Sequence, residues 1–137
     1  MDETLPTSLS DFLLKALPRV QAIYLFGSRA LGTSHPGSDV DMAVLQPVRE
    51  PDLTPLGLYH LRGELEEKAG RRVDLVDLRR ASTVLQVQVL GGRRLVVRDP
   101  RAVEEFEMMV LSYYQALNHQ RRELLEQARR TGRICAC

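Results

Sequence analysis

The pattern of apolar and polar positions predicts that helices and strands alternate along the chain. Between residues 8 and 17, apolar side chains recur at helical spacing and Pro18 follows them, so the pattern predicts a short amphipathic helix over 8–17. Residues 20–26 are rich in β-branched and aromatic side chains and end at Gly27, which predicts a buried strand followed by a tight turn. The segment DVDMAVLQ, residues 39–46, predicts the next strand.

The middle of the chain predicts a second helix and a third strand. Thr54 and Pro55 can open a helix that continues through Lys68, and Gly70 is a typical C-terminal stop. The segment RRVDLVDL, residues 71–78, then predicts a strand. Two strands followed by a helix and another strand indicate an α+β fold, with a mixed sheet and flanking helices.

The last third of the chain contains one ambiguous segment and one long helix. Residues 84–90 alternate in the manner of a strand, but Ser82 or Thr83 could equally cap a helix there, so both interpretations stay open. The segment RRLVVRD, which follows a pair of glycines, predicts a short strand. From Pro100 onward a helical period continues to about Arg130.

A chain of 137 residues is long enough for one compact domain and too short for two ordinary ones. We therefore expect a domain over residues 1–99, which includes the first helix, and a C-terminal helix over 100–131 that packs on the domain or on a partner. Residues 132–137 are expected to form a flexible tail. Cys135 and Cys137 in this tail are not spaced as zinc ligands or as a disulfide framework.

The charge of the chain argues against nucleic-acid binding. The formal net charge is +1, so there is no global basic field, and the one weak local candidate is a C-terminal group of arginines, Arg129, Arg130 and Arg133. No apolar run reaches membrane-spanning length, and the N-terminus lacks the pattern of a signal peptide. We expect a cytoplasmic protein that binds neither nucleic acid directly nor a membrane.

The candidate chemistry lies around two aspartates at the start of the second strand. Asp39 and Asp41 are two residues apart, so on a strand they point to the same face. Two carboxylates at the end of an aliphatic strand repel one another, and a divalent cation relieves that repulsion. Oxygen ligands without a nearby histidine or thiolate favour Mg²⁺ or Mn²⁺ over zinc.

A glycine-serine turn stands ten residues before this pair. Gly27 allows a close approach of the backbone to an anion, and the Ser28 hydroxyl with the following amides can cradle a phosphate. An anion cradle opposite a carboxylate pair suits a nucleotide triphosphate held through metal ions. Chemistry of that kind needs a third carboxylate on a neighbouring strand. Asp74 and Asp77 are three residues apart and point to opposite faces, so at most one of them can join the pair.

The stretch FGSRALGTSHPGSDVDMAVL and the later VDLVDL resemble the DNA polymerase β-like nucleotidyltransferase superfamily. More narrowly, they resemble the minimal nucleotidyltransferases, or MNT proteins, which are antitoxins of HEPN-domain ribonuclease toxins. The resemblance covers residues 20–99. It implies a palm-like nucleotidyltransferase fold with an added C-terminal helix, ATP as substrate and two Mg²⁺ ions, with Mn²⁺ as a substitute.

The resemblance also implies the site residues. Asp39, Asp41 and Asp74 would be both catalytic and metal-binding, and Gly27, Ser28 and Arg29 would bind the nucleotide. For Arg29 a surface salt bridge is an equal alternative. A second arginine that the family often has two residues later is Leu31 here. Asp77 is then expected to be a polar strand end or a loop cap.

The function that the resemblance implies is transfer of AMP from ATP to a tyrosine of a cognate HEPN toxin, which silences the toxin. A different class of function is a non-catalytic antitoxin that neutralises the toxin by binding alone. A third alternative, a small-molecule nucleotidyltransferase, is disfavoured because 137 residues leave little room for an acceptor-binding domain.

The last helix carries an apolar stripe that is wider than one narrow face. Packing on its own sheet is the ordinary explanation of such a stripe. Methionine and tyrosine suit protein interfaces, however, and the residues that widen the stripe are Met108, Met109, Val110, Tyr113 and Tyr114. Part of this helix could therefore meet a partner chain in a homo- or hetero-oligomer.

Overall fold

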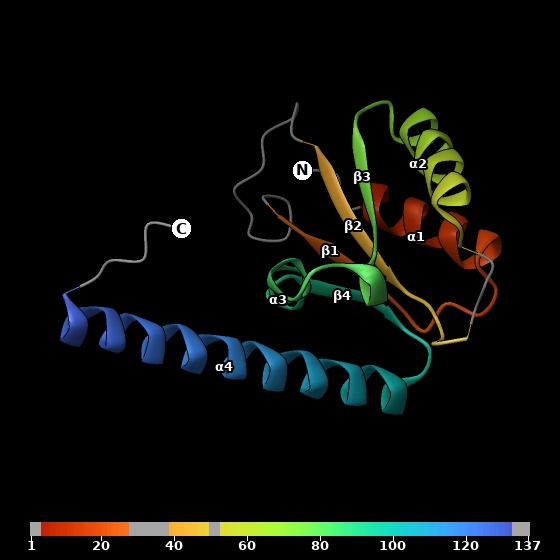
Figure 1. Cartoon of the computed structure of the whole chain (residues 1–137). Coiled ribbons are helices and arrows are strands. Elements are labelled where there is room, and N and C mark those ends of the chain that lie inside the picture. The colour runs from red at the N-terminus through yellow and green to blue at the C-terminus, as the bar shows by residue number, and fades with distance from the viewer. Residues whose placement is uncertain (1–3, 28–38, 50–52, 133–137) are drawn as a thin grey trace.

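The structure is a computed structural model that describes residues 4–27, 39–49 and 53–132. Its helices and strands form one mixed sheet with helices on both faces, which confirms the predicted α+β fold class (Figure 1). In chain order the elements are α1 (Thr4–Ala16), β1 (Ala22–Phe26), β2 (Val40–Leu45), α2 (Pro55–Ala69), β3 (Val73–Asp77), the short 3-10 turn η1 (Leu78–Arg80), α3 (Thr83–Leu90), β4 (Arg93–Val97) and α4 (Pro100–Thr131).

The strands of the sheet lie in the order β3-β2-β1-β4. β1 is antiparallel to both β2 and β4, whereas β2 and β3 are parallel. Parallel neighbours need a crossover connection, and α2 supplies it between β2 and β3. The register sets Phe26 opposite Asp41 and Asp41 opposite Asp74. The end of β1 therefore meets the starts of β2 and β3 at one end of the sheet.

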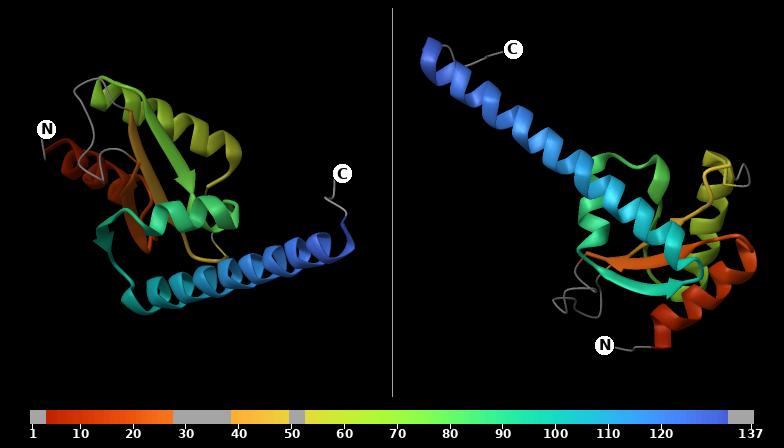
Figure 2. Two further views of the ribbon diagram at one scale, coloured as in Figure 1. Left: turned by 90° about the vertical axis from the view of Figure 1, so that its left-hand side faces the viewer. Right: turned by 90° about the horizontal axis from the view of Figure 1, so that it is seen from below.

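Side chains alternate between the two faces of the sheet and build two separate cores. On one face Ile23, Leu25 and Val44 pack with α1 and α2. On the other face Tyr24 and Phe26 pack with α3 and with the first turns of α4. Figures 1 and 2 show the sheet between these two layers of helices.

One helix begins earlier than the sequence predicts, and the segment that was ambiguous in the sequence is a helix. α1 begins at Thr4 rather than at residue 8, because Pro6 falls in its first turn, where a missing N–H removes no helical hydrogen bond. The ambiguous segment is helix α3, and Ser82 Oγ caps it by accepting a hydrogen bond from Leu85 N at 3.2 Å. Val89 of α3 is buried in the core between the sheet and α4.

The start of α4 is fastened to the sheet by polar and apolar contacts. The buried hydroxyl of Tyr24 donates a hydrogen bond to Glu107 Oε2 at 2.7 Å, and Arg94 Nε of β4 donates to the same oxygen at 3.0 Å. Burial and the nearby Glu107 carboxylate raise the pKa of Tyr24 well above its ordinary value, so the hydroxyl stays a donor. None of the helices in the described ranges is long and apolar enough to cross a membrane.

The turn between α3 and β4 passes very close to β1. A Cβ atom on Gly92 would lie 2.3 Å from Leu25 O and 2.9 Å from Phe26 Cα. These are backbone atoms of a central strand, which cannot move aside cheaply. Only glycine therefore fits at this position, and its small size lets the end of α3 lie against the end of β1.

Gly92→Ala should lower the free energy of unfolding by about 1–3 kcal/mol, because the added methyl overlaps the β1 backbone. Gly63→Ala is the matched control, since nothing lies within 4 Å of a Cβ added there in α2. Helix propensity predicts that this control is neutral or stabilises by up to about 1 kcal/mol. Denaturant unfolding of both variants checks the expectation, and a Gly92→Ala protein as stable as the control would contradict it.

Candidate active site

Two aspartates meet where β2 and β3 begin. Asp41 is paired with Asp74 in the parallel register, and residues paired in this way point to the same face of the sheet. Alternation along β2 puts Asp41 on the same face as Ala43, which is the face covered by α3 and α4. Asp39 is exposed and lies immediately before β2. The sheet thus brings the three predicted acids to one end of the molecule.

The charge of Asp41 is disfavoured in the metal-free chain. Burial raises the pKa of Asp41 above its ordinary value, and the negative charges of Asp74 and Asp39 raise it further. Carboxylates that repel one another at a half-open site fit a hard divalent cation such as Mg²⁺ or Mn²⁺. Within the described ranges, no three His, Cys, Asp or Glu side chains form a ready-made metal cluster. Beside these acids a cation would take further oxygen ligands, which water or a bound phosphate can supply.

The turn after β1 lies directly against Asp41. Gly27 adopts the left-handed backbone conformation with φ 73°, and a Cβ atom on it would lie 2.2 Å from Asp41 Oδ2. The backbone angle favours glycine here, and a side chain at this position would also displace the Asp41 carboxylate. Ser28 and Arg29, the other residues predicted to bind the nucleotide, lie outside the described residues.

A pocket of about 630 Å³ opens beside the acids. Its walls differ in character, because carboxylates lie on one side and apolar side chains of β1 and α3 on the other. The residues that line it are Phe26, Gly27, Asp41, Asp74, Leu85, Val87, Gln88, Gly91 and Gly92. The contribution of α3 was not predicted from the sequence, because the structure type of residues 84–90 was ambiguous there.

Comparison with known proteins gives this site a family. The family described as Polymerase beta, Nucleotidyltransferase matches residues 9–101, which include Gly27, Asp41 and Asp74. The chain belongs to this nucleotidyltransferase family. The match ends where α4 has just begun.

Similar proteins include one named as an adenylyltransferase and chains from toxin-antitoxin structures. Protein adenylyltransferase MntA of Shewanella oneidensis is 37% identical over 110 residues, which are 80% of this chain and 77% of MntA. A crystal structure of a toxin-antitoxin with AMP-PNP matches with a TM-score of 0.76 and 35% identity, over 93% of this chain and 98% of the matched chain. A structure of tri-AMPylated Shewanella oneidensis HEPN toxin in complex with MNT antitoxin matches with a TM-score of 0.74 and 31% identity.

These matches confirm the resemblance to the MNT antitoxins that the sequence motifs predicted. They also extend beyond the catalytic domain. α4 has 32 of the 137 residues, so a structural match over 93% of this chain has to include most of α4. The helix is therefore shared with the toxin-antitoxin structures.

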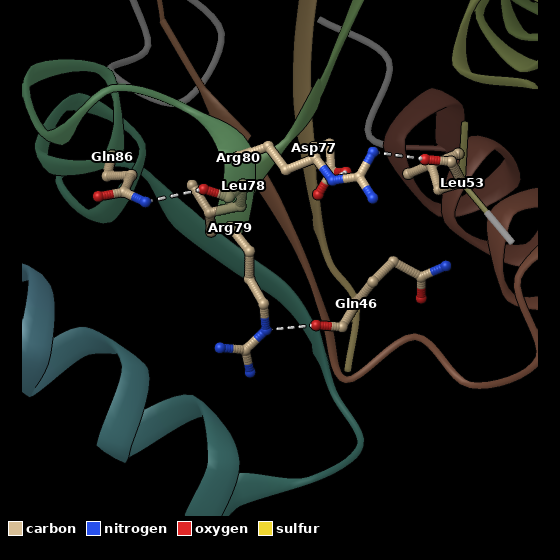
Figure 3. A network of polar contacts seen from close by, with 7 residues as sticks. All are labelled: Gln46, Leu53, Asp77, Leu78, Arg79, Arg80 and Gln86. Carbon is tan, nitrogen blue, oxygen red and sulfur yellow. Dashed lines mark hydrogen bonds and ion pairs between the residues drawn. The ribbon is translucent and has the colours of Figure 1, made fainter. Parts of the chain in front are cut away.

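Asp77, the other aspartate of the nucleotidyltransferase motif VDLVDL, lies away from the site. It is the last residue of β3, and Arg80 Nε lies 3.6 Å from its carboxylate. Arg79 Nε donates to Gln46 O at 2.5 Å, and Arg80 Nη1 donates to Leu53 O at 3.3 Å, as Figure 3 shows. Asp77 is therefore a polar strand end in an anchoring network. Its side chain makes no hydrogen bond that caps η1.

Arg62 of α2 is a neighbour of the site that the sequence did not reveal. Its Nη1 lies 3.9 Å from Asp74 Oδ1, and both side chains are well exposed. The pair is weak by geometry and exposure, so it leaves Asp74 available to a cation. An arginine on a different element, twelve residues away along the chain, carries no local signal that points to Asp74.

Asp41→Asn should raise the melting temperature of the metal-free protein at pH 7. A carboxyl whose pKa is higher in the folded chain than in the unfolded one penalises folding above both pKa values, and the penalty disappears when the pH falls below them. We expect a gain of about 1–3 °C, because solvent screens charges at this half-open site. The gain should vanish near pH 3.

Thermal melts in EDTA at the two pH values check this expectation. The matched control is Asp11→Asn, which removes one exposed carboxylate from α1 on the far face of the sheet. A melting temperature that falls at pH 7 in Asp41→Asn would show that the Asp41 charge is stabilised, not repelled.

Proposed function

We propose that this protein is a Mg²⁺-dependent adenylyltransferase that moves AMP from ATP to a tyrosine hydroxyl of a HEPN-domain toxin, and that it acts in this way as the antitoxin. The observation that carries the proposal is the in-register pair of Asp41 and Asp74 beside the Gly27 turn, in a chain that belongs to the nucleotidyltransferase family. The relatives named as adenylyltransferase and as an antitoxin bound to an AMPylated toxin support it.

Each site residue has a distinct part in the proposed reaction. The Gly27 turn, with Ser28 and Arg29, holds the triphosphate, and Asp39 and Asp41 hold two Mg²⁺ ions, for which Mn²⁺ can substitute. Asp74 helps to hold the ion that activates the acceptor oxygen. When bound, the ions neutralise the triphosphate and lower the pKa of the attacking hydroxyl. The pocket wall made by Phe26 and α3 is apolar and suits the adenosine portion of ATP.

The reaction exchanges a phosphoanhydride linkage of ATP for a phosphoester linkage to the acceptor. The acceptor oxygen forms a bond to the α-phosphorus, the bond from that phosphorus to the bridging oxygen of the β-phosphate breaks, and pyrophosphate leaves. The hydroxyl proton goes to solvent. The protein contributes mainly position and charge, because the carboxylates fix where the cations bind and the Gly27 turn excludes side-chain bulk.

A non-catalytic antitoxin is the second candidate. It would require the same partner but no intact acid cluster. The unfavourable environment of the Asp41 carboxylate argues against it. A chain under no catalytic constraint has no need to keep Asp41 partly buried beside Asp74 and Asp39 at a cost in stability. A small-molecule nucleotidyltransferase is the third, and the described residues contain no acceptor-binding domain beyond the sheet and its helices.

The decisive experiment is a mass measurement on the toxin. A HEPN-domain protein, sought by its motif in the open reading frames adjacent to this gene, is incubated with this protein and Mg-ATP, repurified, and analysed as intact protein and as peptides. We expect added mass in whole AMP units on a tyrosine, and ribonuclease activity that stays lost after the antitoxin is removed.

The control is Asp39→Asn/Asp41→Asn, which removes the carboxylate pair without opening a core cavity. It should add no mass, and the repurified toxin should regain its ribonuclease activity. Protection that is as durable with this variant as with wild type, and without added mass in either sample, would overturn the adenylyltransferase assignment in favour of binding alone.

A further inference from the structure

α4 is much longer than the domain that it packs on. Its buried residues, Val103, Phe106 and Val110, all lie in the first third of the helix. Beyond Val110 no residue of α4 is buried, and the helix continues away from the sheet and the other helices (Figure 2). We call residues 111–131 of α4 the arm.

The arm continues the apolar line that packs the start of α4 on the domain. Leu117 and Leu124 follow Val103 and Val110 at intervals of seven residues, which is two helical turns. All four side chains therefore point in nearly the same direction. Val103 and Val110 are fully buried, whereas Leu117 is 37% and Leu124 is 66% exposed. The same face that is a core contact at the start of the helix has no cover on the arm.

An arm of this kind needs a second body to cover it. A helix that extends into water is normally polar all round and is stabilised by pairs of residues four apart, and exposed leucines in line add nothing to it. The contact of His119 with Glu123 and the ion pair of Arg130 with Glu126 join residues four apart and stabilise the helix only weakly. The leucines are therefore explained by contact with another protein.

The direction of the apolar line relates the arm to the active site. Val103, Phe106 and Val110 pack on the sheet face that also carries Tyr24 and Ala43. Asp41 and Asp74 open on this same face. A protein that covered the line of Leu117 and Leu124 would sit in the corner between the arm and the domain, on the side of the sheet from which the acids are reached.

From these observations we infer that the arm is the docking surface for the acceptor protein, and that it holds the HEPN toxin on the acid-bearing side of the sheet while the hydroxyl enters the site. This inference rests on the proposed function for the identity of the partner. It is supported by the family match, which ends as α4 begins, and by the structural matches, which include most of α4. On this inference the domain carries out the chemistry and the arm binds the partner.

The charge of the arm specifies the partner surface further. The arm contains four arginines and two glutamates, and of these only Arg121 lies beside the apolar line, four residues after Leu117 and three before Leu124. The complementary surface is an apolar groove with a carboxylate at the position of Arg121. Steering by such charges speeds association at low salt, whereas the leucines determine how long the complex lasts.

The test compares two pairs of substitutions on opposite sides of the same helix. Leu117→Gln/Leu124→Gln removes the apolar line. Met108→Gln/Leu111→Gln removes two exposed apolar side chains from the far side, and one of them, Met108, is a residue that the sequence alone suggested for a partner contact. Glutamine keeps the helix propensity in both variants. Circular dichroism should show unchanged helix content, because neither pair is buried.

We expect the first variant to bind the adjacent HEPN protein at least tenfold more weakly by calorimetry, and its KM for that protein in AMP transfer to rise by a similar factor while kcat stays within twofold. The control should stay within twofold of wild type in all three quantities. Equal binding by wild type and Leu117→Gln/Leu124→Gln, or a loss confined to the control, would overturn the inference.

Two further outcomes are separated by the same measurements. A wild-type dimer in sedimentation that Leu117→Gln/Leu124→Gln dissolves, with toxin affinity unchanged, would assign the arm to a second copy of this chain and overturn the inference. Absence of AMP transfer by wild type would defeat the proposed function, but the calorimetry would still decide the arm. Asp39→Asn/Asp41→Asn should bind the toxin as wild type does and transfer nothing.

Discussion

The parallel pairing of β2 and β3 is the constraint on which the site depends. Hydrogen bonding between two strands, together with the burial of Val40 and Val73 beside them, fixes Asp41 opposite Asp74. Burial, and after it the negative charges of Asp74 and Asp39, raise the pKa of Asp41, so holding the two carboxylates together has a cost. The hydrophobic cores on both faces of the sheet outweigh this local cost. In the proposed function a divalent cation would relieve this repulsion. A bound nucleotide would supply the further oxygen ligands of the cation.

At two glycines, Gly27 and Gly92, the main chain itself lies at the edge of this site. Gly27 closes β1 against the carboxylate of Asp41, and Gly92 brings the end of α3 against the end of β1. At Gly92 no side chain fits against the β1 backbone, and at Gly27 the left-handed backbone conformation favours glycine. The pocket therefore owes its shape to main-chain segments held in place by the sheet, and its chemistry to the aspartates that project into it. A rigid frame of this kind suits a reaction in which position and charge supply most of the catalysis.

Much of this architecture could be predicted from the sequence, because the relevant signals are local. Strand alternation predicted that Asp74 and Asp77 point to opposite faces, and the family resemblance then selected Asp74. The structure puts the two in different surroundings, the pocket and the Arg80 ion pair. The secondary structure of residues 84–90 could not be predicted, because their sequence fits both a strand and a helix. The helix places Val89 in the core between the sheet and α4, and this burial favours it. Contacts between distant segments, such as Arg62 with Asp74 or Gly92 with β1, leave no local pattern. The sequence also cannot say where the domain stops supporting α4, because its apolar line has the same period on both sides of Val110.

The central claim is that the register of β3 makes Asp74, and not Asp77, the partner of Asp41 in binding cations. Titration of Mn²⁺ by electron paramagnetic resonance, in the presence of a non-hydrolysable ATP analogue, tests it with wild type, Asp74→Asn and Asp77→Asn. The account predicts at least tenfold weaker binding of one ion in Asp74→Asn and binding within about twofold of wild type in Asp77→Asn, because only Asp74 faces the pocket. The reverse ranking, or equal binding by all three proteins, would contradict it.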